Sequence, residues 1–358
     1  MADDDRAHGV HFVGTIPLTD AEEVFRTTAE LVGDRVRRLP DGETGARKDW
    51  VWIQVPILQR HPDLEQTPVE VPGVGTLTLM SPRPGVDPDA LDLGDIGYAG
   101  FARESYARFR ALKQQGVIAE HVRFQVDLPT PIAITSISAR PDAAPAIEAA
   151  YRRALPHELD QITAHVPHDE LAVQWDVCLE LLMVEGHPIV APWFDAVWDG
   201  VLERMATLGG AVPAGVELGI HLCYGDYQHE RSVELDDARS LVRLANALTE
   251  AIPRPIDFLH LPVREDVDAA RYLAPLADLR LASQTELYLG LITDRDGLTE
   301  ALGRIAQARN HIPRFGIATE CGMGRTPADV VPTLLEIHRD ASAPVAPQRT
   351  AEDSSVGT

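Results

Sequence analysis

The sequence predicts an α/β protein, namely a (β/α)8 TIM barrel built as a single domain with an irregular insertion after its second strand. Two observations carry this prediction: short apolar runs alternate with longer amphipathic segments, and there are eight such runs. An open doubly wound sheet gives the same alternation, but no Gly-x-Gly-x-x-Gly motif follows the first run and no P-loop occurs. The 358 residues suit one barrel as well as two smaller domains.

Each predicted strand is a short apolar run. The eight runs occupy residues 11–16, 36–39, 122–126, 171–175, 216–220, 256–259, 287–292 and 314–318. The predicted insertion, about residues 40–97, is rich in Gly and Pro and contains a hairpin-like stretch at 75–80.

The predicted helices lie between these runs. The first opens at Thr19 and Asp20 and ends near Gly33, and the last opens at Thr326 as N-cap with Pro327 in the first turn. The helices between them cover about residues 101–115, 143–165, 193–208, 236–251, 267–276 and 297–310. Residues 342–358 have no helical or strand period, so we expect a barrel domain over 1–341 and a disordered tail.

The amino-acid composition limits the kinds of partner and the cellular compartment that we expect. Lys and Arg number 32 against 55 Asp and Glu, a formal net charge of −23, which argues against nucleic acid and anionic membranes. No apolar stretch approaches the ~20 residues of a membrane span, and the N-terminus lacks the pattern of a secretory signal. Three cysteines suit a reducing compartment. We therefore expect a cytoplasmic protein; the sequence does not indicate its oligomeric state.

Polar residues follow the predicted strands at their C-terminal ends, the face where barrel enzymes carry their active sites. His221 and Cys223 follow the fifth strand and point the same way if the chain is extended, while Cys321 follows the eighth and can reach over the barrel mouth. One imidazole and two thiolates suit Zn²⁺ and leave a fourth position open. The alternative is that both cysteines are buried apolar residues and His221 is a loop histidine.

Candidates for catalysis follow the sixth and seventh strands. His260 is either a fourth, displaceable zinc ligand or a hydrogen-bonded core histidine. Asp294 and Asp296 serve either proton transfer or, as surface carboxylates, the capping of the next helix. Cys178 is expected to be a packing residue.

Candidates for substrate binding lie at three other strand ends. Glu43 and Asp176 can bind a substrate ammonium group, unless each pairs with an arginine such as Arg47. Arg325 lies between a Gly-rich turn and the last predicted helix, where it either holds a carboxylate or phosphate or is a plain surface residue.

Six short motifs occur in order along the chain: FVGTIP at 12–17, GETGARKD at 42–49, LPTPI at 128–132, VQWD at 173–176, HLCY at 221–224 and ECGM at 320–323. Together they resemble the catalytic barrel of cobalamin-independent methionine synthase and its relatives, within the uroporphyrinogen decarboxylase/methionine synthase barrel superfamily. The similarity touches nearly the whole predicted barrel.

This resemblance implies a zinc site and a substrate site. His221, Cys223 and Cys321 would hold Zn²⁺, while Glu43 and Asp176 would hold the amino group of a homocysteine-like thiol. The implied reaction is an attack of the zinc-bound thiolate on an alkyl carbon.

Two positions depart from the family pattern. His260 stands where the family's glutamate zinc ligand follows strand six, and Asp294 stands where its catalytic histidine follows strand seven. We therefore predict a zinc-dependent thiol alkyl- or methyltransferase whose partners are a small-molecule thiol and an alkyl donor. The alternatives are an epoxide:thiol transferase, as in the related epoxyalkane:coenzyme M transferases, a lyase on the same barrel that cleaves a C–S bond or decarboxylates, and a barrel that binds without turnover.

Overall fold

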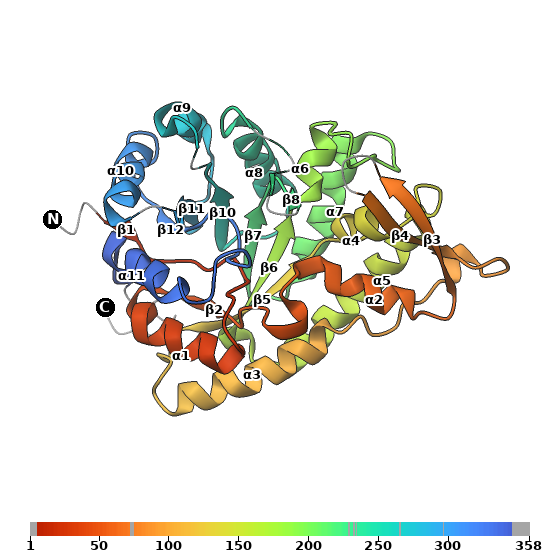
Figure 1. Cartoon of the computed structure of the whole chain (residues 1–358), viewed down its shortest axis with the longest axis horizontal. Helices are drawn as coiled ribbons and strands as arrows, with labels where there is room; N and C mark the ends of the chain where they lie inside the picture. Colours follow the sequence, from red (N-terminus) through yellow and green to blue (C-terminus); the bar gives the residue numbers. More distant parts are fainter. Residues whose placement is uncertain are drawn as a thin grey trace, which may run out of the picture.

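The computed structural model describes residues 6–345, apart from 72–74, 228–229, 232, 234, 265 and 296. Within these residues, seven parallel strands form one curved sheet in the order β12-β11-β10-β7-β6-β5-β2, and helices surround it (Figure 1). The strands are β2 (Arg38–Pro40), β5 (Arg123–Pro129), β6 (Leu171–Val177), β7 (Glu217–Leu222), β10 (Phe258–Pro262), β11 (Glu286–Ile292) and β12 (Gly316–Thr319). The sheet is a curled parallel half-barrel.

The prediction of a strand over 11–16 is wrong, so the described sheet has seven strands and not eight. The gap between its edges is spanned by Val10, which forms single parallel bridges with Val36, just before β2, and with Ile317 of β12. After Val10 the backbone no longer pairs as a strand, and side-chain amides of two glutamines donate hydrogen bonds to its carbonyl groups. Gln125 donates to Phe12 O at 2.8 Å and Gln174 donates to Val13 O at 2.7 Å.

The helices follow the predicted order along the chain. The described α-helices are α1 (Ala21–Val32), α2 (Gln54–Gln59), α3 (Tyr98–Gln114), α4 (Pro131–Ser138), α5 (Ala144–His165), α6 (Leu179–Val184), α7 (Val197–Ala211), α8 (Arg239–Ala251), α9 (Ala269–Leu273), α10 (Leu298–Arg309) and α11 (Val331–Ala341). Short 3-10 helices are η2 (Gly33–Arg35), η3 (Gly45–Arg47), η4 (Trp50–Ile53), η5 (Pro88–Ala90), η6 (His168–Glu170) and η7 (Ala274–Asp278). Asp20 caps α1 as predicted, because its side chain accepts from Glu23 N.

The last helix begins later than predicted, at Val331 and not after Thr326. Thr326 is not an N-cap because its groups bond elsewhere. Its amide donates to Met323 O in a turn, and its hydroxyl donates to the Asp294 carboxylate at 3.0 Å.

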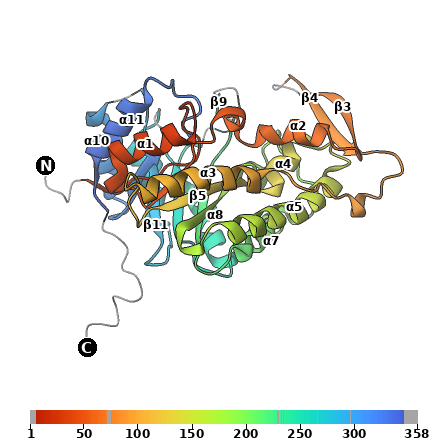
Figure 2. The same ribbon diagram turned by 90° about the horizontal axis from the view of Figure 1, so that it is seen from below.

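The insertion after β2 contains the expected hairpin. β3 (Leu64–Val71) pairs antiparallel with β4 (Gly75–Pro82), and the hairpin lies beside α2 at the end of the molecule opposite α10 and α11 (Figure 2). A second short antiparallel pair, β8 (Asp226–Tyr227) with β9 (Glu230–Arg231), follows β7.

The predicted tail begins inside the fold. β13 (Ser342–Ala343) pairs in parallel with β1 (Ala7–His8), so these two residues belong to an ordered strand pair. The remainder of the predicted tail, from 346 to 358, lies outside the described residues.

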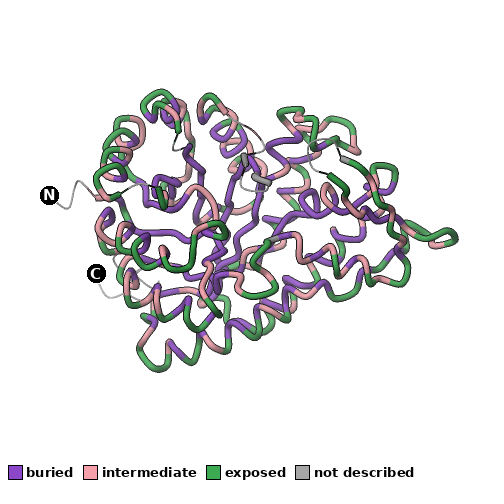
Figure 3. The backbone as a smooth tube through the Cα atoms, viewed as in Figure 1, coloured by how far each residue is buried: buried purple, intermediate pink, exposed green. Residues whose placement is uncertain are grey.

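Buried residues follow the central strands, where Figure 3 shows the longest purple stretches, and they form one large apolar cluster. At the start of the strands the interior is closed by Arg38, which pairs with Glu217 and Glu286 and lies 4.1 Å from the centre of the Phe258 ring. This ion-pair network fills the N-terminal end of the sheet, so we expect a functional site at the C-terminal end of the strands. Among the described residues, no helix has the length and apolarity needed to cross a bilayer.

Candidate functional site

Three sequence-distant side chains meet at the C-terminal end of the sheet. His221 lies in β7, Cys223 follows that strand directly, and Cys321 lies two residues beyond β12. Their ligand atoms all lie within 4.8 Å of one another, and Cys321 Sγ is 3.8 Å from His221 Nε2. In a tetrahedral zinc site, bond lengths of about 2.0 and 2.3 Å place nitrogen and sulfur about 3.5 Å apart. The three groups therefore need only a small contraction to hold one ion.

The chemistry of this group fits zinc. His221 and Cys223 are buried, and Cys321 retains partial exposure. Burial, followed by the neighbouring His260, lowers the pKa of His221 well below its usual value, so the ring stays neutral and can bind a metal. Cys178 is buried and is not part of the group found among the described residues.

His260 lies directly behind His221. Its Nδ1 is 2.7 Å from His221 Nδ1, and its Nε2 donates to Thr319 O at 3.1 Å. The residue is fully buried, and that burial lowers its pKa to about 3. With both ring nitrogens engaged, His260 has the arrangement of a hydrogen-bonded core histidine.

Carboxylates converge beside the metal-binding group. Asp176 of β6 is the register partner of His221, which places it on the neighbouring strand at the same height. A methyl group added at Gly14 would lie 3.3 Å from Asp127 Oδ2 and 3.4 Å from Glu43 Oε2, so these two carboxylates face the same point. The three acidic side chains accept from neutral groups: Thr15 donates to Glu43, Gln125 to Asp127 at 2.8 Å, and Gln174 to Asp176 at 2.9 Å.

Crowding and burial make Glu43 and Asp127 costly to ionise. Burial raises the pKa of Glu43 to about 7, against the opposing effects of Thr15 and Arg47. Burial, and then the charges of Asp176 and Glu43, raise the pKa of Asp127 well above its usual range. A cation placed among these carboxylates would relieve both effects.

Arg47 is committed elsewhere. Its guanidinium pairs with Asp41 at 2.5 Å, and Asp41 also accepts from the amide of Glu43 at 2.9 Å. That contact holds Glu43 at φ +48°, a left-handed backbone that a non-glycine residue seldom adopts. The Glu43 side chain itself accepts a hydrogen bond from the Thr15 hydroxyl.

Two residues of this site were missed by the sequence analysis. Asp127 carried a usable signal, since it directly follows the predicted strand 122–126. Tyr98 had no signal in the sequence, because it is the first residue of α3 and does not follow a predicted strand. The turn before it is held by Glu158, which accepts from the amides of Ile96 and Gly97 at 2.7 and 3.0 Å. The Tyr98 side chain is buried; burial, followed by the neighbouring Tyr151 and Glu43, raises its pKa well above the usual value.

Three other predicted residues lie at the surface or outside the described chain. Asp294 is exposed and accepts from Thr326, as a surface carboxylate would. Arg325 is also exposed, and it is not beside a helix N-terminus because α11 begins only at Val331. Asp296 lies outside the described residues.

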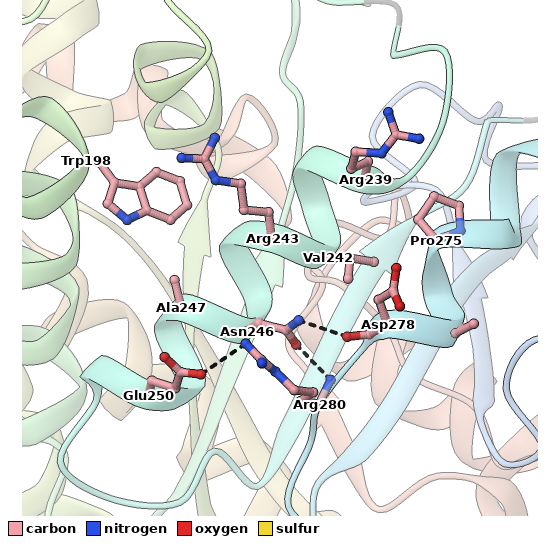
Figure 4. A pocket seen from close by; sticks show the side chains of 11 residues that line it. Trp198, Arg239, Val242, Arg243, Asn246, Ala247, Glu250, Pro275, Asp278 and Arg280 are labelled. Atoms are coloured by element: carbon pink, nitrogen blue, oxygen red, sulfur yellow. Dashed lines mark hydrogen bonds and ion pairs between the residues drawn. The ribbon is translucent and has the colours of Figure 1, made fainter.

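A separate surface hollow lies on the outer helices and not at the strand ends (Figure 4). Arg243 lies 4.1 Å from the Trp198 ring centre, and Arg280 pairs with Glu250 at 3.0 Å. None of the predicted site residues lies among the described residues that line it.

No protein-family model matches the sequence, and no curated protein matches it. Solved structures do match the fold. A B12-independent methionine synthase from Shewanella sp. W3-18-1, in complex with selenomethionine, aligns with a TM-score of 0.59 and 14% identity over 94% of this chain and 96% of that chain. A methyltransferase from Methanosarcina mazei aligns with a TM-score of 0.54 and 12% identity over 94% of each chain. At these identities the likeness shows a shared fold.

Proposed function

We propose that this protein is a zinc-dependent transferase that moves a methyl or other alkyl group onto the thiol of a small molecule that also carries an ammonium group. The observation that carries the proposal is the meeting of His221, Cys223 and Cys321 at the strand ends, beside three carboxylates. The names of the two structural neighbours, a methionine synthase and a methyltransferase, agree with this class of reaction.

The zinc ion would be held by one imidazole and two thiolates, with the fourth position left for the substrate. When bound, it supplies the Lewis acidity that keeps a coordinated thiol deprotonated at neutral pH. In the transfer step the thiolate sulfur forms a bond to the alkyl carbon, and the bond from that carbon to the donor's leaving group breaks with its electron pair.

The chain's own residues orient the thiol. Glu43, Asp127 and Asp176 receive the ammonium group and fix the distance between nitrogen and sulfur, which makes the attack effectively intramolecular. The loop that carries Cys321 is tied to this site, since Met323 N donates to Thr15 O at 2.8 Å and Thr15 donates to Glu43. The negative charge of these carboxylates disfavours the binding of a thiol that carries an anionic group and no ammonium group, such as a mercaptosulfonate.

Metal analysis and a product assay test the proposal together. We expect one zinc per chain, lost in Cys321→Ser and kept in Cys178→Ser, and a new sulfur in the zinc-edge absorption spectrum when homocysteine is added. Incubation of homocysteine with a panel of methyl and epoxide donors should give an S-alkylated product by mass spectrometry. A protein without stoichiometric zinc, or a zinc protein that alkylates no thiol, would overturn it.

A further inference from the structure

A chain of hydrogen bonds runs behind the candidate zinc site and links β7 to its neighbour β10, and β10 across β11 to the end of β12. His221 of β7 meets His260 of β10, its register partner, through their Nδ1 atoms at 2.7 Å. His260 Nε2 meets Thr319 O at the end of β12 at 3.1 Å, and Thr319 Oγ1 donates to Cys321 O at 2.6 Å. Two of the proposed zinc ligands are thus linked through residues that are not ligands themselves.

The direction of each hydrogen bond follows from the donors and acceptors available. A backbone carbonyl only accepts, so His260 Nε2 carries its ring's proton. A neutral imidazole has one N–H, which leaves His260 Nδ1 as an acceptor. His221 must then donate through Nδ1, and its Nε2 keeps the lone pair. That nitrogen is the one 3.8 Å from Cys321 Sγ.

Both rings are neutral, as this assignment requires. His221 and His260 are buried, and the partners of His260 are an imidazole nitrogen and a backbone carbonyl, neither of which offers the counter-charge that a buried imidazolium needs. The third buried histidine nearby, His11, does not compete for these atoms, because its Nε2 bonds Gln174 Oε1 at 2.9 Å.

We infer that His260 is a positioning residue that fixes His221 as the Nδ1-protonated tautomer and so presents Nε2 to the metal. This role replaces ligation: the one lone pair of the neutral His260 ring, on Nδ1, accepts from His221, so His260 could bind an ion only by giving up that bond. The fourth position of a metal held by His221, Cys223 and Cys321 would therefore stay open for the thiol. The inference rests on the proposed zinc site, and outer partners of this kind typically change metal affinity 10–100-fold when removed.

The tautomer itself can be read without metal, substrate or any variant of His260. Two-bond ¹H–¹⁵N correlation spectra of the apo protein separate the two neutral imidazole forms, and a His221→Asn spectrum assigns the His221 signals. We expect His221 protonated at Nδ1 and His260 at Nε2. The reverse assignment for His221 overturns the inference. If the protein bound no zinc, the proposed function would fail while this spectrum still decided the tautomer.

Zinc affinity then tests what the tautomer does. By competition with a chelator, His260→Leu should weaken zinc binding by about 10–100-fold. His260→Gln, whose amide can both accept from His221 and donate to Thr319, should recover most of that loss. His338→Leu is the matched control, since His338 is also fully buried but lies in α11 and bonds Leu334 O; it should alter stability and leave zinc affinity unchanged. Wild-type affinity in His260→Leu, or no recovery in a folded His260→Gln, contradicts the positioning role.

Discussion

At the scale of single residues, we expect the charge of the proposed substrate site to select among thiols. Asp127 lies within reach of the same point as Glu43, and its hydrogen-bond donor Gln125 is neutral. Removing one charged acceptor from a buried ammonium costs about 1.5–3 kcal/mol, or roughly 10- to 100-fold in affinity. We expect Asp127→Asn to weaken binding of homocysteine by that factor in calorimetry on the zinc-loaded protein.

The desamino analogue 4-mercaptobutanoate isolates the ammonium contact. Its affinity should not fall in Asp127→Asn, because it has no cation to lose and the substitution removes a negative charge that repels this anion. Asp142→Asn, a change at an exposed carboxylate paired with Arg140, should leave both ligands unaffected. Equal losses for both thiols in Asp127→Asn would show that the substitution acts on the fold.

Glu43 makes the binding of an aminothiol depend on pH. Burial raises the pKa of Glu43 to about 7, so the group is largely neutral below that pH and attracts an ammonium only above it. Homocysteine affinity should therefore rise more steeply than that of 4-mercaptobutanoate as pH increases from 6 to 8, because only homocysteine adds the Glu43 ionisation to that of the thiol. Glu43→Gln should make the two slopes equal. In the ligand-free protein, a rise in pH acts against stability. Between pH 4.5 and about 7, Glu43 is ionised in the unfolded chain but stays protonated in the folded protein, so the free energy of unfolding falls as pH rises.

At the scale of elements, the segment that replaces the first predicted strand creates room for the site. Gly14 lies there at φ +155°, and an added methyl group would press on Asp127 and Glu43 at 3.3 and 3.4 Å. Gly14→Ala should fill the ammonium position, so we expect homocysteine binding to fall at least tenfold while zinc content stays at one per chain. Gly303→Ala in α10, where nothing lies within 4 Å of the added methyl, should leave both unchanged. Loss of zinc in Gly14→Ala would mean that the segment supports the metal site and not the substrate.

The same segment shows where sequence periodicity stops being informative. Seven of the eight predicted strands are present, since their apolar runs are buried in a ladder of parallel neighbours. Residues 11–16 have the same apolar composition, yet two of their carbonyl groups, Phe12 O and Val13 O, accept from the side chains of Gln125 and Gln174. The start of α11 was mistaken for a similar reason, because the hydroxyl of Thr326 bonds Asp294 and not a helix amide. In each case a long-range side-chain bond overrides a local pattern.

At the scale of the whole molecule, the candidate metal site depends on the complete sheet. His221 and Cys321 are separated by 100 positions; His221 lies in the central strand β7, and Cys321 follows the edge strand β12. The sequence predicts these candidate ligands at strand ends, and the structure has them there. The hydrogen bond between His221 and His260 could not be predicted from the sequence, because the orientation of a buried ring depends on packing.

A site assembled only by folding should couple metal binding to global stability. Zinc that binds the folded state alone stabilises it by about 2.7 kcal/mol at a free concentration 100 times its dissociation constant, and the effect grows logarithmically with concentration. We expect the melting temperature of wild type and Cys178→Ser to rise with free zinc in a metal-buffered thermal scan, and that of Cys321→Ser to stay flat. A rise of equal size in Cys321→Ser would place the stabilising zinc elsewhere. A fall with zinc in the wild type would show that the unfolded chain binds the metal more tightly, and that the folded strands do not bring the three ligands together.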